Sequence, residues 1–287
     1  MNHKKYKTVI VASESSALYT TKRILMEAKK LKYPSIWINP YEYMLNPTTL
    51  SQNNKFGLYF HRTTGIRYDD FDLLVSKQHE LLGYKISNSL ESLKSFRDKT
   101  DQALFLHQHG LSPIKTISYR GLLNEKCWES ISQLSSNEKF IIKMARGNQG
   151  IGVNLVNGLS SLKSFLETFH ALKDQKFIIQ PFIEHKKEWR VFVIKNEIAG
   201  IIERTIEKED FRGNAKRSEG RVIKKLSADI EAEVLRGADL SGLDYCGVDI
   251  MTDKKNFYFL EMNPVPGFEQ LEELSGLNIA RELLCRI

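Results

Sequence analysis

Two apolar segments near the end of the chain are each interrupted by a carboxylate, and this pattern constrains the fold more than any other. Residues 246–251 and 257–263 read as strands, with Asp249 in the first and Glu261 and Asn263 in the second. Ionised groups in buried strands are costly unless they are paired or bind a metal. A hairpin centred on Lys255 would place Asp249 opposite Glu261, because both lie six residues from 255.

The spacing within the second strand indicates a use for these polar side chains. Glu261 and Asn263 are two residues apart, so they share one face of the strand. Two carboxylates and an amide oxygen on one face are the hard oxygen ligands that magnesium takes. The alternative is a pair of solvent-facing acids on an edge hairpin.

A second segment is rich in glycine and lies between predicted strands. Lys143 ends the strand 140–143, and residues 147–152 contain three glycines before the strand 152–156 and the helix 161–172. Glycine lets backbone N–H groups approach an anion closely, and a nearby lysine adds a charge for the same phosphates. The spacing is not that of a P-loop, and no helix starts directly after it. A phosphate-binding loop and an ordinary glycine-rich hairpin both fit this segment.

Positive charge is concentrated in a third segment. Residues 204–225 hold eight Lys and Arg against four Asp and Glu, and they include Arg204, Arg212 and Asn214. This density could neutralise the oxygens of a transferring phosphoryl group and of a carboxylate substrate. The other interpretation is a mobile charged loop.

The rest of the chain alternates strand and helix patterns. Strands are predicted at 8–13, 35–39 and 73–76, and a helix at 17–31, capped by Ser13, Ser15 or Ser16. This βαβ pattern favours a small parallel sheet, and it lacks the GxGxxG turn of a dinucleotide site. Further helices are predicted at 98–109 (ended by Gly110), 229–240 and 279–286, and further strands at 177–179, 190–195 and 198–205, with a turn at 196–197.

Composition excludes several classes of protein. The chain is 41% hydrophobic and 27% charged, as is usual for a soluble globular protein. No apolar stretch approaches the roughly 18 to 20 residues that span a bilayer. We also find no signal-peptide pattern, and the three cysteines share no CxxC spacing. These observations favour a reducing compartment, so we expect a cytoplasmic protein with no membrane partner.

The basic excess lies almost wholly in the first third of the chain. Residues 1–95 hold 14 Lys and Arg against 8 Asp and Glu, a surplus of 6 out of a net charge of +7. Nearby aromatic side chains could stack on bases, so a nucleic-acid partner is an alternative; they are Tyr33, Trp37, Tyr41 and Tyr43. We favour the simpler interpretation that the basic residues between 22 and 32 solvate the outer face of one helix.

The three polar segments, in this order and spacing, resemble the ATP-grasp superfamily, and within it most closely the RimK-type α-L-glutamate ligases. The resemblance covers about residues 98–287. It rests on Asp98-Lys99, Ile142-Lys143, the glycine segment 147–153, Ile202-Glu203-Arg204, the segment 210–214, Gly247-Val248-Asp249-Ile250 and the segment 261–269. It implies an α/β (α+β) ATP-grasp fold with a small N-terminal α/β pre-ATP-grasp domain at 1–95. The small ATP-grasp subdomain with the glycine loop would occupy 96–180, and the C-terminal subdomain with the metal site 181–287.

The resemblance also implies roles for individual residues. Lys99 and Lys143 would hold the ATP phosphates, and Glu188 the ribose hydroxyls. The rest of the ATP site would be the loop Gly147, Asn148, Gln149, Gly150, Ile151 and Gly152 and the adenine-reading hinge Gln180, Pro181, Phe182 and Ile183. Pro181 stands where the family often has Glu, and the segment from there to Glu188 is shortened; a hinge that reads adenine through backbone groups still fits. The catalytic residues would be Arg204, Arg212 and Asn214, and the metal ligands Asp249, Glu261 and Asn263.

The sequence therefore predicts an ATP-dependent carboxylate–amine ligase that forms an amide through an acyl phosphate. Its cofactors would be ATP and two magnesium ions, with manganese as the other candidate metal. Its substrates would be an amino acid, with glutamate implied by the resemblance, and an acceptor that is a peptide, a protein or a metabolite. Two alternatives remain: a nucleotide-binding regulator with the same fold and no ligase activity, and a nucleic-acid-binding protein. The sequence leaves open whether the chain forms a homo-oligomer.

Overall fold

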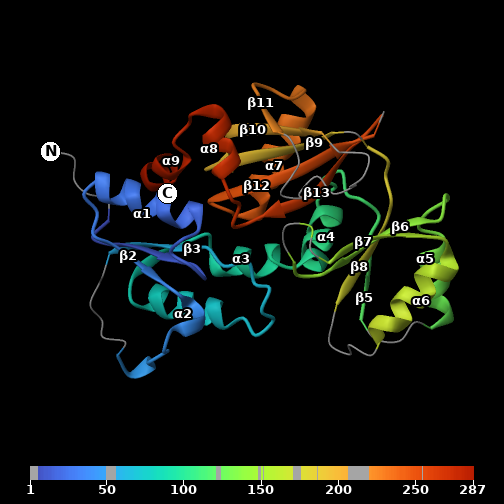
Figure 1. The fold of residues 1–287 in the computed structure, drawn as a ribbon, viewed down its shortest axis with the longest axis horizontal. Helices are drawn as coiled ribbons and strands as arrows, with labels where there is room; N and C mark the ends of the chain where they lie inside the picture. The colour runs from blue at the N-terminus through green and yellow to red at the C-terminus, as the bar shows by residue number, and fades with distance from the viewer. Residues whose placement is uncertain are drawn as a thin grey trace.

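The computed structural model describes residues 6–49, 56–120, 124–147, 150, 152–170, 176–185, 187–205, 220–253 and 255–287. Three β-sheets form the framework (Figure 1). A four-stranded N-terminal sheet and a four-stranded small sheet lie at opposite ends, and a five-stranded large sheet lies above and between them in this view. This mixed architecture confirms the predicted α/β class.

The N-terminal sheet is parallel, as its alternating pattern predicts. Its strand order is β2-β1-β3-β4, and α1 and α2 cover opposite faces of it through the apolar side chains of Ile24 and Leu73. The elements are β1 (Val9–Ala12), α1 (Tyr19–Lys30), β2 (Ser35–Ile38), η1 (Pro40–Glu42), η2 (Pro47–Thr49), β3 (Gly57–His61), α2 (Phe71–Leu81), β4 (Tyr84–Ser87) and α3 (Leu90–Phe96).

Two predictions for this region are wrong. Residues 73–76 lie inside helix α2, because three apolar residues and a serine show no period that separates a strand from a buried helical turn. The strand that follows β2 is instead β3. No serine side chain caps α1 either: Leu18 holds the N-cap position without a side-chain bond. The Ser15 hydroxyl oxygen accepts from the Ala17 N–H, before the helix begins.

The small sheet has its own apolar core. It is antiparallel in the order β5-β8-β6-β7, and helices α5 and α6 pack on it around Phe140, Leu162 and Phe177. The elements are β5 (Ile117–Tyr119), α5 (Glu125–Ser132), β6 (Lys139–Met144), β7 (Val153–Asn157), α6 (Leu159–His170) and β8 (Phe177–Pro181). The glycine segment therefore connects two neighbouring strands, as predicted.

The large sheet is antiparallel, in the order β11-β10-β9-β12-β13. Asp249 pairs with Glu261, which confirms the predicted hairpin register, and the pairing shifts by one residue immediately beyond Asp249. The turn between β9 and β10 is Lys195-Asn196, one residue earlier than predicted, and both have positive φ. The elements are α4 (Lys99–Gln108), β9 (Lys187–Ile194), β10 (Glu197–Thr205), β11 (Gly220–Ile223), α7 (Ala228–Ser241), β12 (Tyr245–Thr252), β13 (Phe257–Asn263), α8 (Glu269–Ser275) and α9 (Ile279–Arg286).

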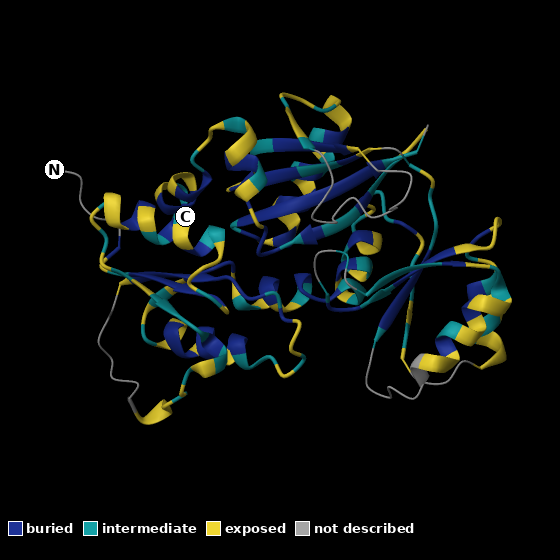
Figure 2. Ribbon diagram, viewed as in Figure 1, coloured by how far each residue is buried: buried dark blue, intermediate teal, exposed yellow. Residues whose placement is uncertain are grey.

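Side chains alternate between the two faces of the large sheet along each strand, so the two faces pack against different elements. One face, with Val191, Ile201 and Val248, packs against α4 and α7. The other face packs its apolar end, including Phe192 and Ile202, against α8, α9 and the N-terminal sheet. The dark strands in Figure 2 follow this buried centre. Further along the same strands, this second face carries polar residues instead. The boundary between its apolar end and its polar end therefore sets the position of the site.

The packing bears on the proposed domain boundaries. Phe96, Leu106 and Leu111 belong to the core of the large sheet, whereas the small sheet has a separate core from Ile131 to Ile179. The division at 95 and 180 stays a proposal, with helix α4 packed on the C-terminal part. None of the described helices is long and apolar enough to cross a membrane.

A buried asparagine directly after β4 ties the N-terminal sheet to the C-terminal part of the chain. The Asn88 side-chain amide donates to the carbonyl oxygens of Tyr245 (2.9 Å) and Pro264 (2.7 Å). Its Oδ1 accepts from the Tyr245 N–H at 3.0 Å. Pro264 directly follows Asn263, so this bond also holds one end of the candidate site.

We expect Asn88→Ala to lower the free energy of unfolding by about 3 kcal/mol, because it leaves buried backbone groups without hydrogen-bond partners. Urea denaturation measures this loss. The exposed Asn157 offers a matched control, and Asn157→Ala should change stability by less than about 0.5 kcal/mol. Similar losses in the two variants would contradict the bridging role of Asn88.

Candidate active site

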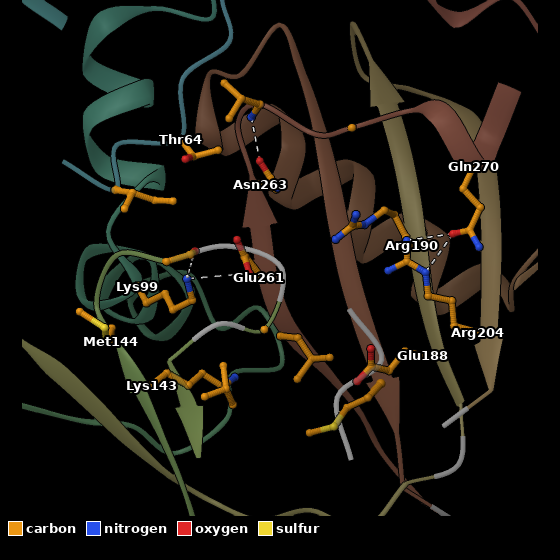
Figure 3. A pocket seen from close by; sticks show the side chains of 18 of the residues that line it. Thr64, Lys99, Lys143, Met144, Glu188, Arg190, Arg204, Glu261, Asn263 and Gln270 are labelled. Carbon is orange, nitrogen blue, oxygen red and sulfur yellow. Dashed lines mark hydrogen bonds and ion pairs between the residues drawn. The ribbon is translucent and has the colours of Figure 1, made fainter. Parts of the chain in front are cut away.

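The three sheets enclose a cleft of about 720 Å³. The small sheet contributes Lys143, the large sheet contributes Arg190 and Glu261, and the loop after β3 contributes Thr64. Figure 3 shows these side chains directed toward one space from separate elements. The cleft therefore joins residues that the sequence separates by more than a hundred positions.

Two lysines meet at the side of the cleft near the glycine segment. Lys99 is the first residue of α4, where the Asp98 carboxylate caps the helix. Its ammonium donates to the Gly147 carbonyl oxygen at 3.1 Å and lies 4.0 Å from the Glu261 carboxylate. Removal from water lowers the pKa of Lys143 to about 8, and the positive charge of Lys99 contributes to this shift. The protein thus places two ammonium groups where an anion would relieve their repulsion.

Two arginines extend the positive charge across the large sheet. The Arg190 guanidinium makes two bonds to Asp249, at 2.7 and 2.5 Å, and this ion pair raises the pKa of Arg190 despite burial. Arg204, on the next strand, donates to the Gln270 side-chain oxygen at 3.1 Å. Burial and the neighbouring charge of Arg190 lower the pKa of Arg204 to about 10. Both arginines line the cleft.

A carboxylate–imidazole pair lies at the end of the cleft next to β8. The His185 imidazole donates from Nε2 to the Glu188 carboxylate at 2.9 Å and from Nδ1 to the Ile183 carbonyl oxygen at 2.9 Å. Burial alone would lower the pKa of His185, but the bond to Glu188 outweighs it and the pKa is raised. Glu188 is therefore held in place beside the expected adenine hinge.

The predicted hinge lines the cleft, although some of its polar groups already have partners. The Phe182 N–H donates to the Lys139 carbonyl oxygen at 2.8 Å, and the Gln180 amide donates to the Thr116 hydroxyl at 2.8 Å. Apolar side chains line the adjoining space between the small and large sheets, as a flat heterocycle would require; they include Ile141, Val153, Met251 and Leu260.

The metal prediction can be tested against the donor groups. Glu261 and Asn263 line the cleft, whereas Asp249 lies behind Arg190 and is 2% exposed. In the described part of the chain, no three His, Cys, Asp or Glu side chains form a metal cluster. The Glu261 carboxylate and the Asn263 amide oxygen are hard donors of the kind magnesium takes, whereas both Asp249 oxygens bond Arg190. The chemistry of the set therefore fits magnesium, with Glu261 the carboxylate directly open to the cleft.

The structure brings most of the predicted site residues together. Those that line the cleft are Lys99, Lys143, Gly147, Gly150, Gln180, Pro181, Phe182, Ile183, Glu188, Arg204, Glu261 and Asn263. Gly152 does not line it; its φ is +76°, and a Cβ there would lie 3.0 Å from the Met144 sulfur. Asn148, Gln149, Ile151, Arg212 and Asn214 lie outside the described residues.

Sequence reasoning missed several residues of the cleft, among them Arg190, His185 and Gln270. Arg190 had a usable signal, because it lies two residues from Glu188 on one strand and hence on the same face. His185 and Gln270 had none, since their roles depend on contacts with residues from other elements.

The family described as RimK-like ATP-grasp domain matches residues 96–287, two thirds of the chain. The chain belongs to the RimK-like ATP-grasp family. The comparison confirms the resemblance seen in the sequence. A relative from Vibrio atlanticus, named probable alpha-L-glutamate ligase, is 30% identical over 211 residues, which cover 72% of this chain and 68% of the relative.

Solved structures support the same fold for the RimK-like chain. A RimK domain ATP-grasp protein from Sphaerobacter thermophilus aligns with a TM-score of 0.77 at 15% identity, covering 98% of this chain and 99% of that one. The ATP-grasp ligase PsnB, complexed with minimal precursor, Mg and ADP, aligns with a TM-score of 0.69 at 16% identity, covering 99% and 97%. The relatives support an ATP-dependent ligase and leave its reaction open.

The lowered pKa of Lys143 leads to a test of its function. Its folded-state pKa lies below that of an unfolded lysine, so the charged form destabilises the folded protein below pH 8. Lys143→Met should therefore raise the melting temperature of the nucleotide-free protein at pH 7, and this gain should fade between pH 8 and about pH 10.5. Differential scanning calorimetry at several pH values measures it.

The same substitution should weaken ATP binding. Loss of a charge-assisted contact to phosphate should lower the affinity about ten- to a hundredfold in calorimetric titrations. Wild-type affinity should fall as the pH rises through 8, and the variant should lack this pH dependence. Lys139→Met, an exposed change on the same strand, should alter neither property. Unchanged ATP affinity in Lys143→Met would remove Lys143 from the site.

Proposed function

We propose that this protein is an ATP- and magnesium-dependent carboxylate–amine ligase. The observation that carries the proposal is the meeting of Lys99, Lys143, Arg190 and Arg204 with Glu261 and Asn263 in one cleft. Such a site suits a polyphosphate together with a divalent cation, because each would neutralise charge that the protein has gathered there.

The reaction would proceed in two steps. A substrate carboxylate oxygen attacks the γ-phosphorus, and the bond from that phosphorus to the β–γ bridging oxygen breaks, which yields an acyl phosphate and ADP. An amine nitrogen then attacks the acyl carbon, phosphate leaves, and the nitrogen loses a proton to give an amide. The contribution of the protein is to position the reactants and to neutralise charge in the cleft.

Each group of residues has a role in this proposal. Lys99 and Lys143 would hold phosphate oxygens, and Glu188, fixed by His185, would accept hydrogen bonds from the ribose hydroxyls. Arg204 would face the substrate carboxylate, and Arg212 with Asn214 would face the γ-phosphate and the acyl phosphate. Glu261 and Asn263, with Asp249, would hold magnesium, which would neutralise charge on the β- and γ-phosphates.

We further propose glutamate as the amino acid, added to a peptide, a protein or a small-molecule acceptor. The name of the Vibrio atlanticus relative supports glutamate. The nucleic-acid alternative is not favoured, because the aromatic side chains it needs pack within the fold. Trp37 donates to Ser13, for example, and Tyr43 contacts the His79 ring. A regulator without ligase activity is the remaining alternative, and phosphate release separates it from a ligase.

The products should be ADP and phosphate, with no AMP or pyrophosphate. A screen of amino acids and acceptors for phosphate release, followed by mass spectrometry, should find adducts of one or more glutamate residues. Hydroxylamine should trap an acyl hydroxamate when ATP and the carboxylate substrate are present without an amine acceptor. Stoichiometric AMP alongside the product would contradict this mechanism.

Glu261→Gln should abolish turnover, because it removes the carboxylate that opens directly onto the cleft. ATP binding should also lose most of its dependence on magnesium, which calorimetry with and without the ion can measure. Glu138→Gln, an exposed change before β6, is the control and should keep full activity. Near-wild-type activity of Glu261→Gln at millimolar magnesium would show that the metal assignment is wrong.

A further inference from the structure

A set of charged side chains lies beside the cleft, outside the groups assigned above, and two of them, Arg146 and Asp98, are buried. Arg146, which directly precedes Gly147, donates from its guanidinium to both oxygens of Asp70, at 2.6 and 3.3 Å. On its other side lies Asp98, with Nε 3.9 Å from a carboxylate oxygen, and Lys176 bonds the same oxygen at 2.5 Å. Asp70 belongs to the N-terminal domain, so these bonds cross from one sheet region to another.

The backbone of Arg146 is held by the same N-terminal segment. Its N–H donates to the Tyr68 hydroxyl at 3.1 Å, and the Tyr68 hydroxyl donates to its carbonyl oxygen at 3.4 Å. The guanidinium also lies 5.1 Å from the centre of the Tyr68 ring. Arg146 is 9% exposed. Residues 68–70 therefore fix both the side chain and the backbone of Arg146. A surface ion pair would hold the side chain alone, and only weakly.

Asp70 is itself held in an unusual geometry. Its φ is +55° at the N-cap position of α2, a conformation that Asp and Asn adopt more readily than most residues. Behind it, Arg97 bonds Asp70 at 3.3 Å and Asp72 at 3.1 and 2.5 Å. The Arg97 side chain packs against Gly65, where a Cβ would lie 1.9 Å from its Nε. This buried support keeps the Asp70 carboxylate directed at Arg146.

The held segment leads straight into the cleft. The Lys99 N–H donates to the Ala145 carbonyl oxygen at 2.8 Å, and the Lys99 ammonium donates to the Gly147 carbonyl oxygen at 3.1 Å. Within residues 145–147, the first and the last residue thus bond Lys99, and the middle one, Arg146, bonds Tyr68 and Asp70. A shift of Arg146 would move Gly147 and the ammonium that it positions.

We propose that Asp70 is a positioning residue for the phosphate end of the nucleotide site. It acts through Arg146, which fixes Gly147 and Lys99, so the N-terminal region sets the geometry of the phosphate end of the cleft. Asp70 also pairs directly with the Arg146 guanidinium, whose other carboxylate neighbour, Asp98, lies 3.9 Å away and also binds Lys176. This inference rests on the proposed function, because it takes ATP as the ligand of the cleft.

A double-mutant cycle tests the proposal. The variants are Asp70→Asn, which keeps the shape and tolerates the positive φ, Arg146→Gln, and the two combined. Each single variant should weaken ATP binding about tenfold in calorimetric titrations, and the double variant should be little weaker than either, as expected for coupled residues. The control is Glu80→Gln, which removes the exposed ion pair between Lys77 and Glu80 and should leave ATP affinity unchanged.

The choice of nucleotide separates positioning from general destabilisation. The loss should appear for ATP and not for AMP, because Gly147 and Lys99 would contact only the terminal phosphates. Equal losses for the two nucleotides, or additive losses in the double variant, would overturn the positioning role of Asp70. Wild-type ATP affinity in both single variants would also overturn it while leaving the proposed function intact. Failure of the wild-type protein itself to bind ATP would instead overturn the proposed function, and this inference with it.

Discussion

The gathering of positive charge in one cleft is the constraint on which the rest of this structure depends. Lys143 and Arg204 both have lowered pKa values, and a neighbouring cation contributes to each shift. The protein tolerates this repulsion by fixing carboxylates among the cations, as in the pair of Arg190 and Asp249. Binding sites are often less stable than they could be, because their charges are arranged for a ligand and not for the empty protein.

The apolar packing of the large sheet holds these charged side chains in position. One face of its strands packs apolar side chains against the N-terminal sheet and then, a few residues further, presents the charged groups. Arg190 lies two residues from Phe192, and Arg204 lies two residues from Ile202, so each arginine shares a sheet face with an apolar core residue. The orientation of the site is thus set by the packing of the core, since a register slip would turn both arginines into the opposite face.

Much of the fold and of the candidate site could be predicted from the sequence wherever the pattern lies within a short stretch of the chain. Hairpin symmetry predicted that Asp249 pairs with Glu261, and Gly110 predicted the end of α4. The failures share a cause, which is dependence on distant residues. The run 73–76 is helical because Leu73 packs under the N-terminal sheet, and the pairing of Arg204 with Gln270 joins residues 66 positions apart. No pattern within a short window contains those contacts.

The segment 62–70 has a consequence for how ligands would influence one another. Its first part lines the cleft through Arg62 and Thr64, and its last part holds Arg146 through Tyr68 and Asp70. A molecule bound against Thr64 and a nucleotide bound at Lys99 would therefore share one short stretch of backbone. Thermodynamic linkage then applies: whatever factor the first ligand imposes on the affinity of the second is returned unchanged. Any coupling between the two ligands through this loop would therefore have the same size whichever of them binds first.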